Sequence, residues 1–125
     1  MNTRAIGSYA EDKAVEFIQK SGKVLVTRNY VTPYGEADAI FIDNGQYVFV
    51  EIKARRTAVY GLPAHAVTRR KQKKYLHIAQ FFFAENKTED YSVRFDVAEV
   101  YITDGEPVVN YIENAFDFSD IDEFY

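Results

Sequence analysis

The stretch EADAIFIDNGQYVFVEIK, residues 36–53, decides the fold, because two apolar runs flank an Asn-Gly dipeptide. Asn-Gly between alternating apolar runs is the strongest local signal for a β-hairpin, since both central residues of a type I′ turn need a positive φ. A two-residue turn sets a register in which Asp38 lies across from Glu51, and Glu36 lies across from Lys53. Side chains alternate along a strand, so these four residues are predicted to share one face.

Two acids placed opposite each other need a reason. Directly opposed residues have Cβ atoms about 4.5–5.5 Å apart, and like charges at that spacing destabilise a sheet. A divalent cation between Asp38 and Glu51 would reverse the sign of their interaction. Both strands otherwise look buried on both faces, and buried charges need a partner or a metal. Asp38 and Glu51 are therefore candidate metal ligands.

The cation that suits this pair is Mg²⁺ or Mn²⁺, which takes one or two carboxylates, waters and substrate phosphate oxygens. The predicted ligands are Asp38, Glu51, the backbone carbonyl of Ile52, and Glu11. Glu11 lies in the first helix, directly after Ala10 of the apolar stripe. Lys53 would assist the attacking water or stabilise the charge that develops on a phosphate.

Glu36 has two possible roles: it coordinates a second ion, or it pairs with Lys53 across the strands. The alternative for the whole cluster is a structural salt-bridge network, in which that pair forms and the other two acids lie on a solvated face.

The rest of the chain predicts a single α/β domain of the order α-β-β-β-α-β-β. Helical spacing covers residues 3–21, with Thr3 as the N-cap and Gly22 after the end. A second helix, capped by Thr68, reaches about residue 86, with Tyr75 on its apolar stripe. Strands are expected at 24–30, at the two arms of the hairpin, at 91–102 and at 108–112. The prediction is a mixed central sheet of about five strands flanked by helices, in a domain of residues 1–116 followed by an acidic tail, 117–125.

Composition limits the compartment and the class of protein. The chain has no cysteine, so disulfides and thiolate metal sites are excluded and a reducing cytoplasm is expected. The N-terminus lacks the apolar core of a signal peptide, and no apolar run approaches the ~20 residues of a membrane span, so no membrane is expected.

The net charge of −4 conceals a basic segment. No acidic residue occurs between positions 52 and 84, and the second helix begins with a run of cations. Cations at a helix N-terminus oppose the macrodipole by ~0.3–1 kcal/mol each, so their presence points to a function. The predicted nucleic-acid-binding residues are Arg55, Arg56, Arg69, Arg70, Lys71, Gln72, Lys73 and Lys74. The alternative is an exposed, solubilising helix face.

The pattern of Asp38, twelve residues, then Glu51-Ile52-Lys53 resembles the PD-(D/E)XK motif of restriction-endonuclease-like nucleases. Nearly the whole chain resembles the YraN-like uncharacterised protein family, through segments such as 7–14, 28–30, 35–38, 49–55, 94–97 and 114–116. The resemblance implies a restriction-endonuclease-like α/β fold related to archaeal Holliday-junction resolvases. It carries over Glu11, Asp38, Glu51 and Lys53 as the active site.

The sequence thus leads to two hypotheses from different classes. The first is a metal-dependent endonuclease that acts on structured or branched DNA. The second is a non-catalytic nucleic-acid-binding or adaptor module that keeps the nuclease fold. Related resolvases act as dimers on two-fold substrates, so a homodimer is a possibility by analogy of fold.

Overall fold

The computed structural model describes residues 2–56, 67–87 and 92–117, and within them it confirms the predicted order of elements. The elements are α1 (Thr3–Lys20), β1 (Val24–Thr32), β2 (Gly35–Asp43), β3 (Gln46–Arg55), α2 (Arg69–Glu85), β4 (Val93–Tyr101) and β5 (Val108–Phe116). Of the predicted acidic tail, only Asp117 lies within the described residues. No helix in these ranges is both long enough and apolar enough to cross a membrane.

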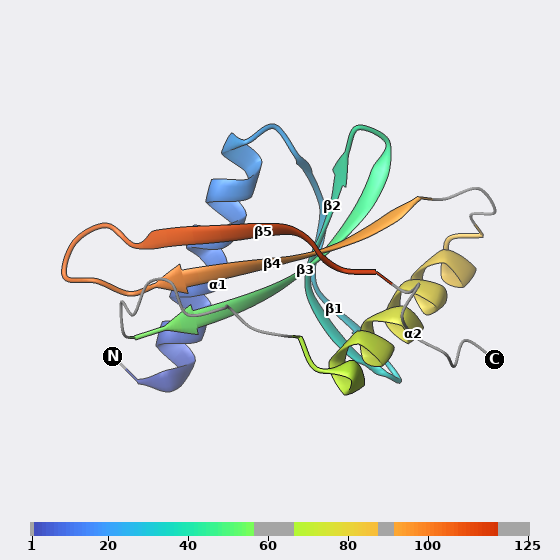
Figure 1. The fold of residues 1–125 in the computed structure, drawn as a ribbon, viewed down its shortest axis with the longest axis horizontal. Helices are drawn as coiled ribbons and strands as arrows, with labels where there is room; N and C mark the ends of the chain where they lie inside the picture. The colour runs from blue at the N-terminus through green and yellow to red at the C-terminus, as the bar shows by residue number, and fades with distance from the viewer. Residues whose placement is uncertain (1, 57–66, 88–91, 118–125) are drawn as a thin grey trace.

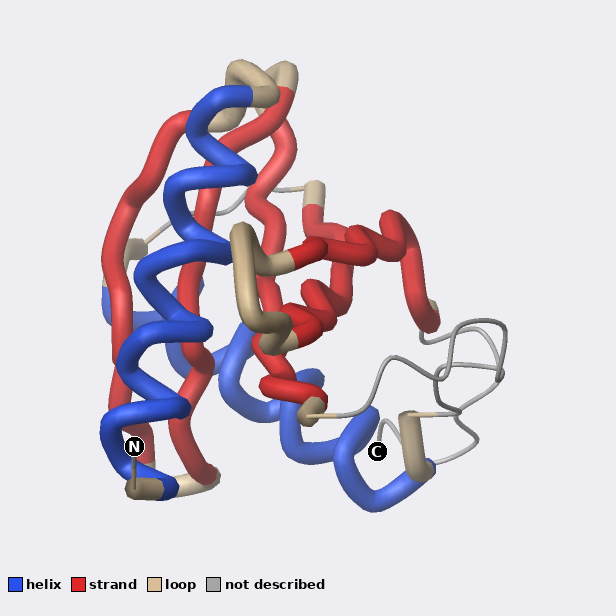
Figure 2. The backbone as a smooth tube through the Cα atoms, turned by 90° about the vertical axis from the view of Figure 1, so that its left-hand side faces the viewer, coloured by secondary structure: helices blue, strands red, loops and turns tan. Residues whose placement is uncertain are grey.

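One mixed five-stranded sheet, with strand order β1-β2-β3-β4-β5, forms the centre of the molecule. Neighbouring strands are antiparallel except β3 and β4, which are parallel and joined through α2. Helix α1 packs on one face and α2 on the other (Figures 1 and 2). The predicted mixed sheet of about five strands flanked by helices is therefore confirmed.

Each helix covers its own hydrophobic cluster. On the α1 side, four helix residues pack on the three central strands: Ala10, Ala14, Val15 and Ile18 against Ala39, Phe41, Val48, Val50, Ala98 and Val100. On the α2 side the cluster is aromatic, with Tyr75, Phe82 and Phe83 packed against Phe49 and Phe95. Strands β2 and β3 are buried on both faces, as their near-continuous apolar runs predicted.

Helix capping corrects one expectation and confirms two. The N-cap of α1 is Asn2, not Thr3, because the extended Asn2 accepts a hydrogen bond from the backbone N–H of Ala5 at 2.8 Å. Thr68 caps α2 as predicted, and accepts from the backbone N–H of Lys71 at 3.2 Å. Gly22 follows α1 with a φ of 101°, in the left-handed region that a helix end favours.

The hairpin register is confirmed only over part of its length. Strands β2 and β3 pair from Asp43 opposite Gln46 to Ala39 opposite Val50, and the ladder ends there. The backbone N–H of Ile52 donates instead to the carboxylate Oδ2 of Asp38 at 2.7 Å. A side chain thus replaces the next step of the ladder.

Beyond this point the two strands separate. Figure 1 shows β2 curving with β1 toward α2, while β3 continues beside β4. The alternation of β2 also breaks, because Ala37 packs in the α2-side cluster and Ala39 in the α1-side cluster. The two alanines therefore lie on opposite faces of the sheet, although regular alternation would place them on the same face. The result is a fork between β2 and β3 with the predicted acids beside it.

Candidate functional site

Asp38 and Glu51 lie at the fork, one on each of the diverging strands. Glu51 is 9% exposed, and Asp38 is half-buried. The hydroxyl of Tyr75 donates to Glu51 Oε1 at 3.1 Å, and the ammonium of Lys71 forms an ion pair with Oε2. Both partners come from α2, so the helix that covers this face also supplies the polar groups that stabilise the buried acid.

Their surroundings shift the pKa values of the two carboxyl groups in opposite directions. Burial raises the pKa of Asp38 to about 7, and a hydrogen bond with Glu51 and the charges of Glu51 and Glu11 add to the effect. Burial also opposes the ionisation of Glu51, but Lys71, Asp38 and Tyr75 together hold its pKa below the ordinary value. Burial therefore favours the protonated form of Asp38, while Lys71 and Tyr75 favour the charged form of Glu51.

This pair fits a Mg²⁺ or Mn²⁺ ion that keeps most of its waters, because one or two carboxylates are what such ions take from a protein. Burial first, and then the charges of Glu51 and Glu11, disfavour a negative charge on Asp38, and a bound cation would offset both effects. The described residues contain no group of three or more His, Cys, Asp or Glu side chains close enough to form a larger cage. The Ile52 carbonyl as a ligand stays a prediction.

Glu11 of α1 approaches the pair from the other side of the sheet. Its charge contributes to the raised pKa of Asp38, so the two groups interact. Its Oε1 accepts from Asn29 Nδ2 at 3.1 Å and from Arg28 Nη2 at 3.4 Å. Neither of these β1 residues was among the predicted site residues. Asn29 has a φ of 50°, which is uncommon for a residue other than glycine.

Lys53 is half-buried on β3, two residues beyond Glu51. Burial lowers its pKa, and so do the charges of Lys71 and Arg55, while Glu51 and Glu99 act in the opposite direction. A lysine in this setting is a suitable donor to a phosphate oxygen or to an attacking water.

Glu99, which the sequence reasoning missed, pairs with Lys53 in the β3–β4 register and is fully buried. It accepts hydrogen bonds from Arg55 Nε and Nη2, both at 3.3 Å, and from Asn110 Nδ2 at 3.0 Å. One signal was available: Glu99 lies on the same face of the predicted strand as the apolar Val97 and Tyr101.

Glu36 is exposed and lies opposite Val31 of β1. The β2–β3 ladder ends before it could face Lys53, and the described residues show no ion pair between the two. The predicted pairing across the strands is therefore not formed. The physical reason is the fork, which carries this end of β2 away from β3.

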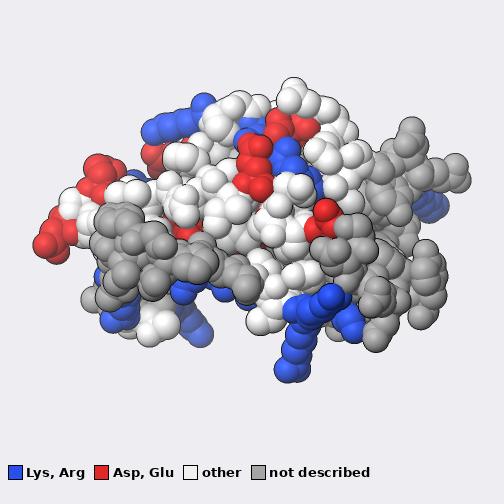
Figure 3. All heavy atoms as spheres, viewed as in Figure 1, with Lys and Arg blue, Asp and Glu red and all other residues white. Residues whose placement is uncertain are grey.

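The basic start of α2 divides between the site and the surface. Lys71 turns inward to Glu51, while Arg69 and Arg70 are exposed, and Lys73 and Lys74 are partly exposed. Figure 3 shows basic side chains projecting at the lower edge, where α2 begins. Arg56, another of the predicted nucleic-acid-binding residues, is exposed directly after the end of β3.

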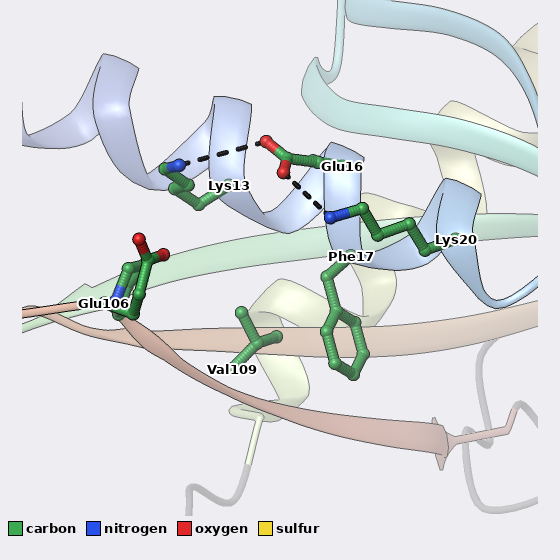
Figure 4. A pocket seen from close by; sticks show the side chains of 7 residues that line it. Lys13, Glu16, Phe17, Lys20, Glu106 and Val109 are labelled. Carbon is green, nitrogen blue, oxygen red and sulfur yellow. Dashed lines mark hydrogen bonds and ion pairs between the residues drawn. The ribbon is translucent and has the colours of Figure 1, made fainter.

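Gln72 has a structural contact, because its Nε2 donates to the Val67 carbonyl at 2.8 Å. Together with Arg69 it lines a hollow of about 310 Å³ against the end of β5. A second hollow, of about 200 Å³, lies on the other side of the sheet (Figure 4). It is lined by Lys13, Glu16, Phe17 and Lys20 of α1 and by Glu106, Pro107 and Val109 near the β4–β5 turn, and it contains none of the predicted site residues.

A five-stranded mixed sheet between two helices, with an acidic pair where two central strands diverge, is consistent with the restriction-endonuclease-like class of α/β proteins. The chain belongs to Uncharacterised protein family UPF0102, which matches residues 10–100, and this confirms the YraN-like resemblance.

The relatives share most of their length with this chain. A UPF0102 protein of Caldicellulosiruptor saccharolyticus is 40% identical over 118 residues, covering 93% of this chain and 100% of the relative. A UPF0102 protein of Trichlorobacter lovleyi is 38% identical over 118 residues, covering 93% of each chain. A UPF0102 protein of Clostridioides difficile is 34% identical over 116 residues, covering 93% of this chain and 100% of the relative. These names carry the family designation without an activity.

Proposed function

We propose that this protein is a metal-dependent endonuclease that hydrolyses phosphodiester bonds in structured or branched DNA. The observation that carries the proposal is the pair of acids, Asp38 and buried Glu51, at the fork where the β2–β3 ladder ends. Burial raises the pKa of Asp38 to about 7, and a divalent cation between the two acids would offset the cost of charging both.

In this proposal Asp38 and Glu51 hold Mg²⁺ or Mn²⁺, and Glu11 adds negative charge from α1. When bound, the ion would lower the pKa of a coordinated water and offset the charge that develops on the phosphate. Lys53 faces the same region with a lowered pKa, and we assign to it the stabilisation of the phosphate or of the attacking water. Lys71 balances the charge of Glu51 in the metal-free protein.

The exposed cations around the start of α2 would hold the substrate. Arg69 and Arg70 are exposed there, and Lys71 links this surface to the acid pair. Contacts from such side chains reach phosphates and therefore position a nucleic acid without reading its sequence. This favours recognition of a nucleic-acid structure over a sequence.

A second candidate, a non-catalytic nucleic-acid-binding or adaptor module, is favoured by one specific observation. The Lys71 ammonium already contacts the buried oxygen of Glu51, and within the described residues Glu11 does not come close enough to complete a three-acid metal site with the pair. In that case Lys71 and Tyr75 would satisfy Glu51 permanently, and the site would need no ion.

A cleavage assay on a panel of substrates decides between the two. Four-way junction, flapped, single-stranded and duplex DNA, with matched RNA, are incubated with Mg²⁺, Mn²⁺ or EDTA. We expect metal-dependent cleavage of a branched or flapped DNA that Glu51→Gln and Lys53→Met abolish. Glu106→Gln, in an exposed turn outside the site, is the matched control and should retain activity. Cleavage that persists in both site variants would reject these assignments.

Calorimetry supplies the complementary measurement. Wild-type protein should bind Mg²⁺ or Mn²⁺, and Asp38→Asn should weaken that binding at least tenfold. DNA binding without cleavage, together with metal binding that is absent or unaffected by Asp38→Asn, would favour the adaptor.

A branched substrate with two-fold symmetry presents two equivalent phosphates, so a homodimer on such DNA is part of the proposal. Light scattering with and without junction DNA tests it, and a complex that contains one protein chain per junction would reject it.

A further inference from the structure

An exposed pair of aromatic rings lies beside the basic start of α2. Tyr34, in the β1–β2 turn, stacks on His77 of α2 with ring centroids 5.0 Å apart and planes 24° apart. Tyr34 is 53% exposed, and His77 is also exposed. His77 therefore stacks on one side of the Tyr34 ring, and the rest of the ring surface is open to solvent.

The turn that carries Tyr34 is well fixed. The Thr32 hydroxyl accepts from the Tyr34 backbone N–H at 3.0 Å and donates to the Gly35 carbonyl at 2.8 Å. The side chain of Lys74 passes so close to Gly35 that an added Cβ would meet it at 2.9 Å. Gly35 also has a φ of 137°, a conformation that glycine adopts readily. The turn is thus held against α2, and the tyrosine ring is preorganised.

The cations of α2 lie in line with these rings. Arg70, Lys74 and His77 are spaced by four and three residues, so they lie on one face of the helix. Lys71, which contacts Glu51, is six residues before His77, or about 9 Å along the helix axis at ~1.5 Å per residue. That distance corresponds to about three stacked nucleotides at ~3.4 Å each, and to fewer in an extended strand.

We propose that Tyr34 and His77 form a stacking platform for an unpaired base of the substrate, within a few nucleotides of the acid pair. Arg70 and Lys74 contact the phosphates of the same strand. Base–aromatic stacking tolerates any sequence but needs an exposed base face, which a continuous duplex does not offer. The platform therefore selects single-stranded, flapped or junction DNA. The inference rests on the proposed function, because it names the substrate feature that the same site would recognise.

The test is binding without cleavage, in EDTA, measured by fluorescence anisotropy on a labelled single strand and on a duplex of the same sequence. Tyr34→Leu should weaken single-strand binding about fivefold or more, the lower end of the ~5- to 150-fold range expected for loss of one stacked base. Duplex binding should be unchanged, and Tyr34→Phe should keep wild-type affinity for both. Phe17→Leu, which removes a ring that is 42% exposed on α1, is the matched control and should change neither.

An abasic scan separates stacking from a purely structural contact. Oligonucleotides that each lack one base should bind wild-type protein more weakly when a particular position is abasic, and Tyr34→Leu should remove that difference. His77→Leu, with thermal unfolding of every variant, provides a second probe if Tyr34→Leu folds poorly.

Three outcomes would overturn the platform. In the first, Tyr34→Leu and His77→Leu fold and bind single strands as wild type does. In the second, single-strand and duplex affinity fall equally. In the third, no abasic position matters. If Glu51-dependent cleavage persists in any of these cases, the platform fails and the nuclease stands. If wild-type protein binds no nucleic acid, both fail.

Discussion

Replacing Asp38 by asparagine should make the metal-free protein more stable at alkaline pH. Burial and the neighbouring Glu51 raise the pKa of Asp38 from 3.8 to about 7, so ionising this carboxyl in the folded state is costly. An amide of the same shape is never charged. Its oxygen can still accept the hydrogen bond that the Ile52 N–H donates at 2.7 Å, and its NH₂ can donate toward Glu51.

The size and sign of the effect follow from proton linkage. Between pH 3.8 and about 7 the native protein holds a proton on Asp38 that the unfolded chain has released. This contribution to stability is fully present below pH 3.8 and is lost as the pH rises to about 7. The loss is about 1.4 kcal/mol per pH unit, or about 2–3 kcal/mol between about pH 5 and about pH 7. Glu51 titrates below this window, because its pKa is lowered from 4.5.

Urea denaturation in EDTA, at several pH values between about 5 and 8, measures this difference. The free energy of unfolding of Asp38→Asn, minus that of wild type, should grow by about 2–3 kcal/mol across the range. Asp104→Asn, an exposed aspartate in the β4–β5 turn, is the matched control and should show a flat difference. A flat difference for Asp38→Asn as well would mean that the carboxyl is ionised throughout, and would refute the raised pKa of Asp38.

Three further results are expected. Mg²⁺ should raise Tm more at about pH 8 than at about pH 6, since it must replace the Asp38 proton. Calorimetry should show that the affinity for Mg²⁺ falls about tenfold per pH unit below about pH 7, and equal affinities at the two pH values would contradict this. Arg55→Met should lower the free energy of unfolding by about 1.5–3 kcal/mol in urea titrations, because buried Glu99 loses charged hydrogen bonds; no change would show that its remaining donors suffice. Asn29→Ala should lower the free energy of unfolding by about 1–2 kcal/mol, because alanine tolerates the φ of 50° less well and Glu11 loses a donor. Thermal melts that also include Asn29→Gly separate the two causes, and an unchanged Tm in Asn29→Ala would reject both.

The hairpin shows how far local chemistry carries a prediction. The Asn-Gly turn correctly gave the pairing from Asp43 opposite Gln46 to Ala39 opposite Val50. The same register failed one step later, because the Asp38 side chain takes the Ile52 N–H and β2 leaves β3. Side-chain competition for a backbone donor is not visible in an alternating pattern.

The polar partners of the acid pair come from a part of the chain that is distant in sequence. Lys71 and Tyr75 were predicted as a surface cation and a core ring, yet both reach Glu51 from α2. Their spacing of four residues put them on one helix face, but nothing local indicated which strand that face would cover.

The sequence by itself determined the order of the elements, the two apolar helix faces, the hairpin turn and the identity of the acids, because each depends on a short-range period or on turn chemistry. Only the tertiary structure decided that Asp38 and Glu51 lie at a fork where burial raises the pKa of Asp38, and that Glu11 is held by Arg28 and Asn29. The physical reason is that burial and neighbouring charge set a pKa, and both arise from the packing of α1 and α2 on opposite faces of the sheet.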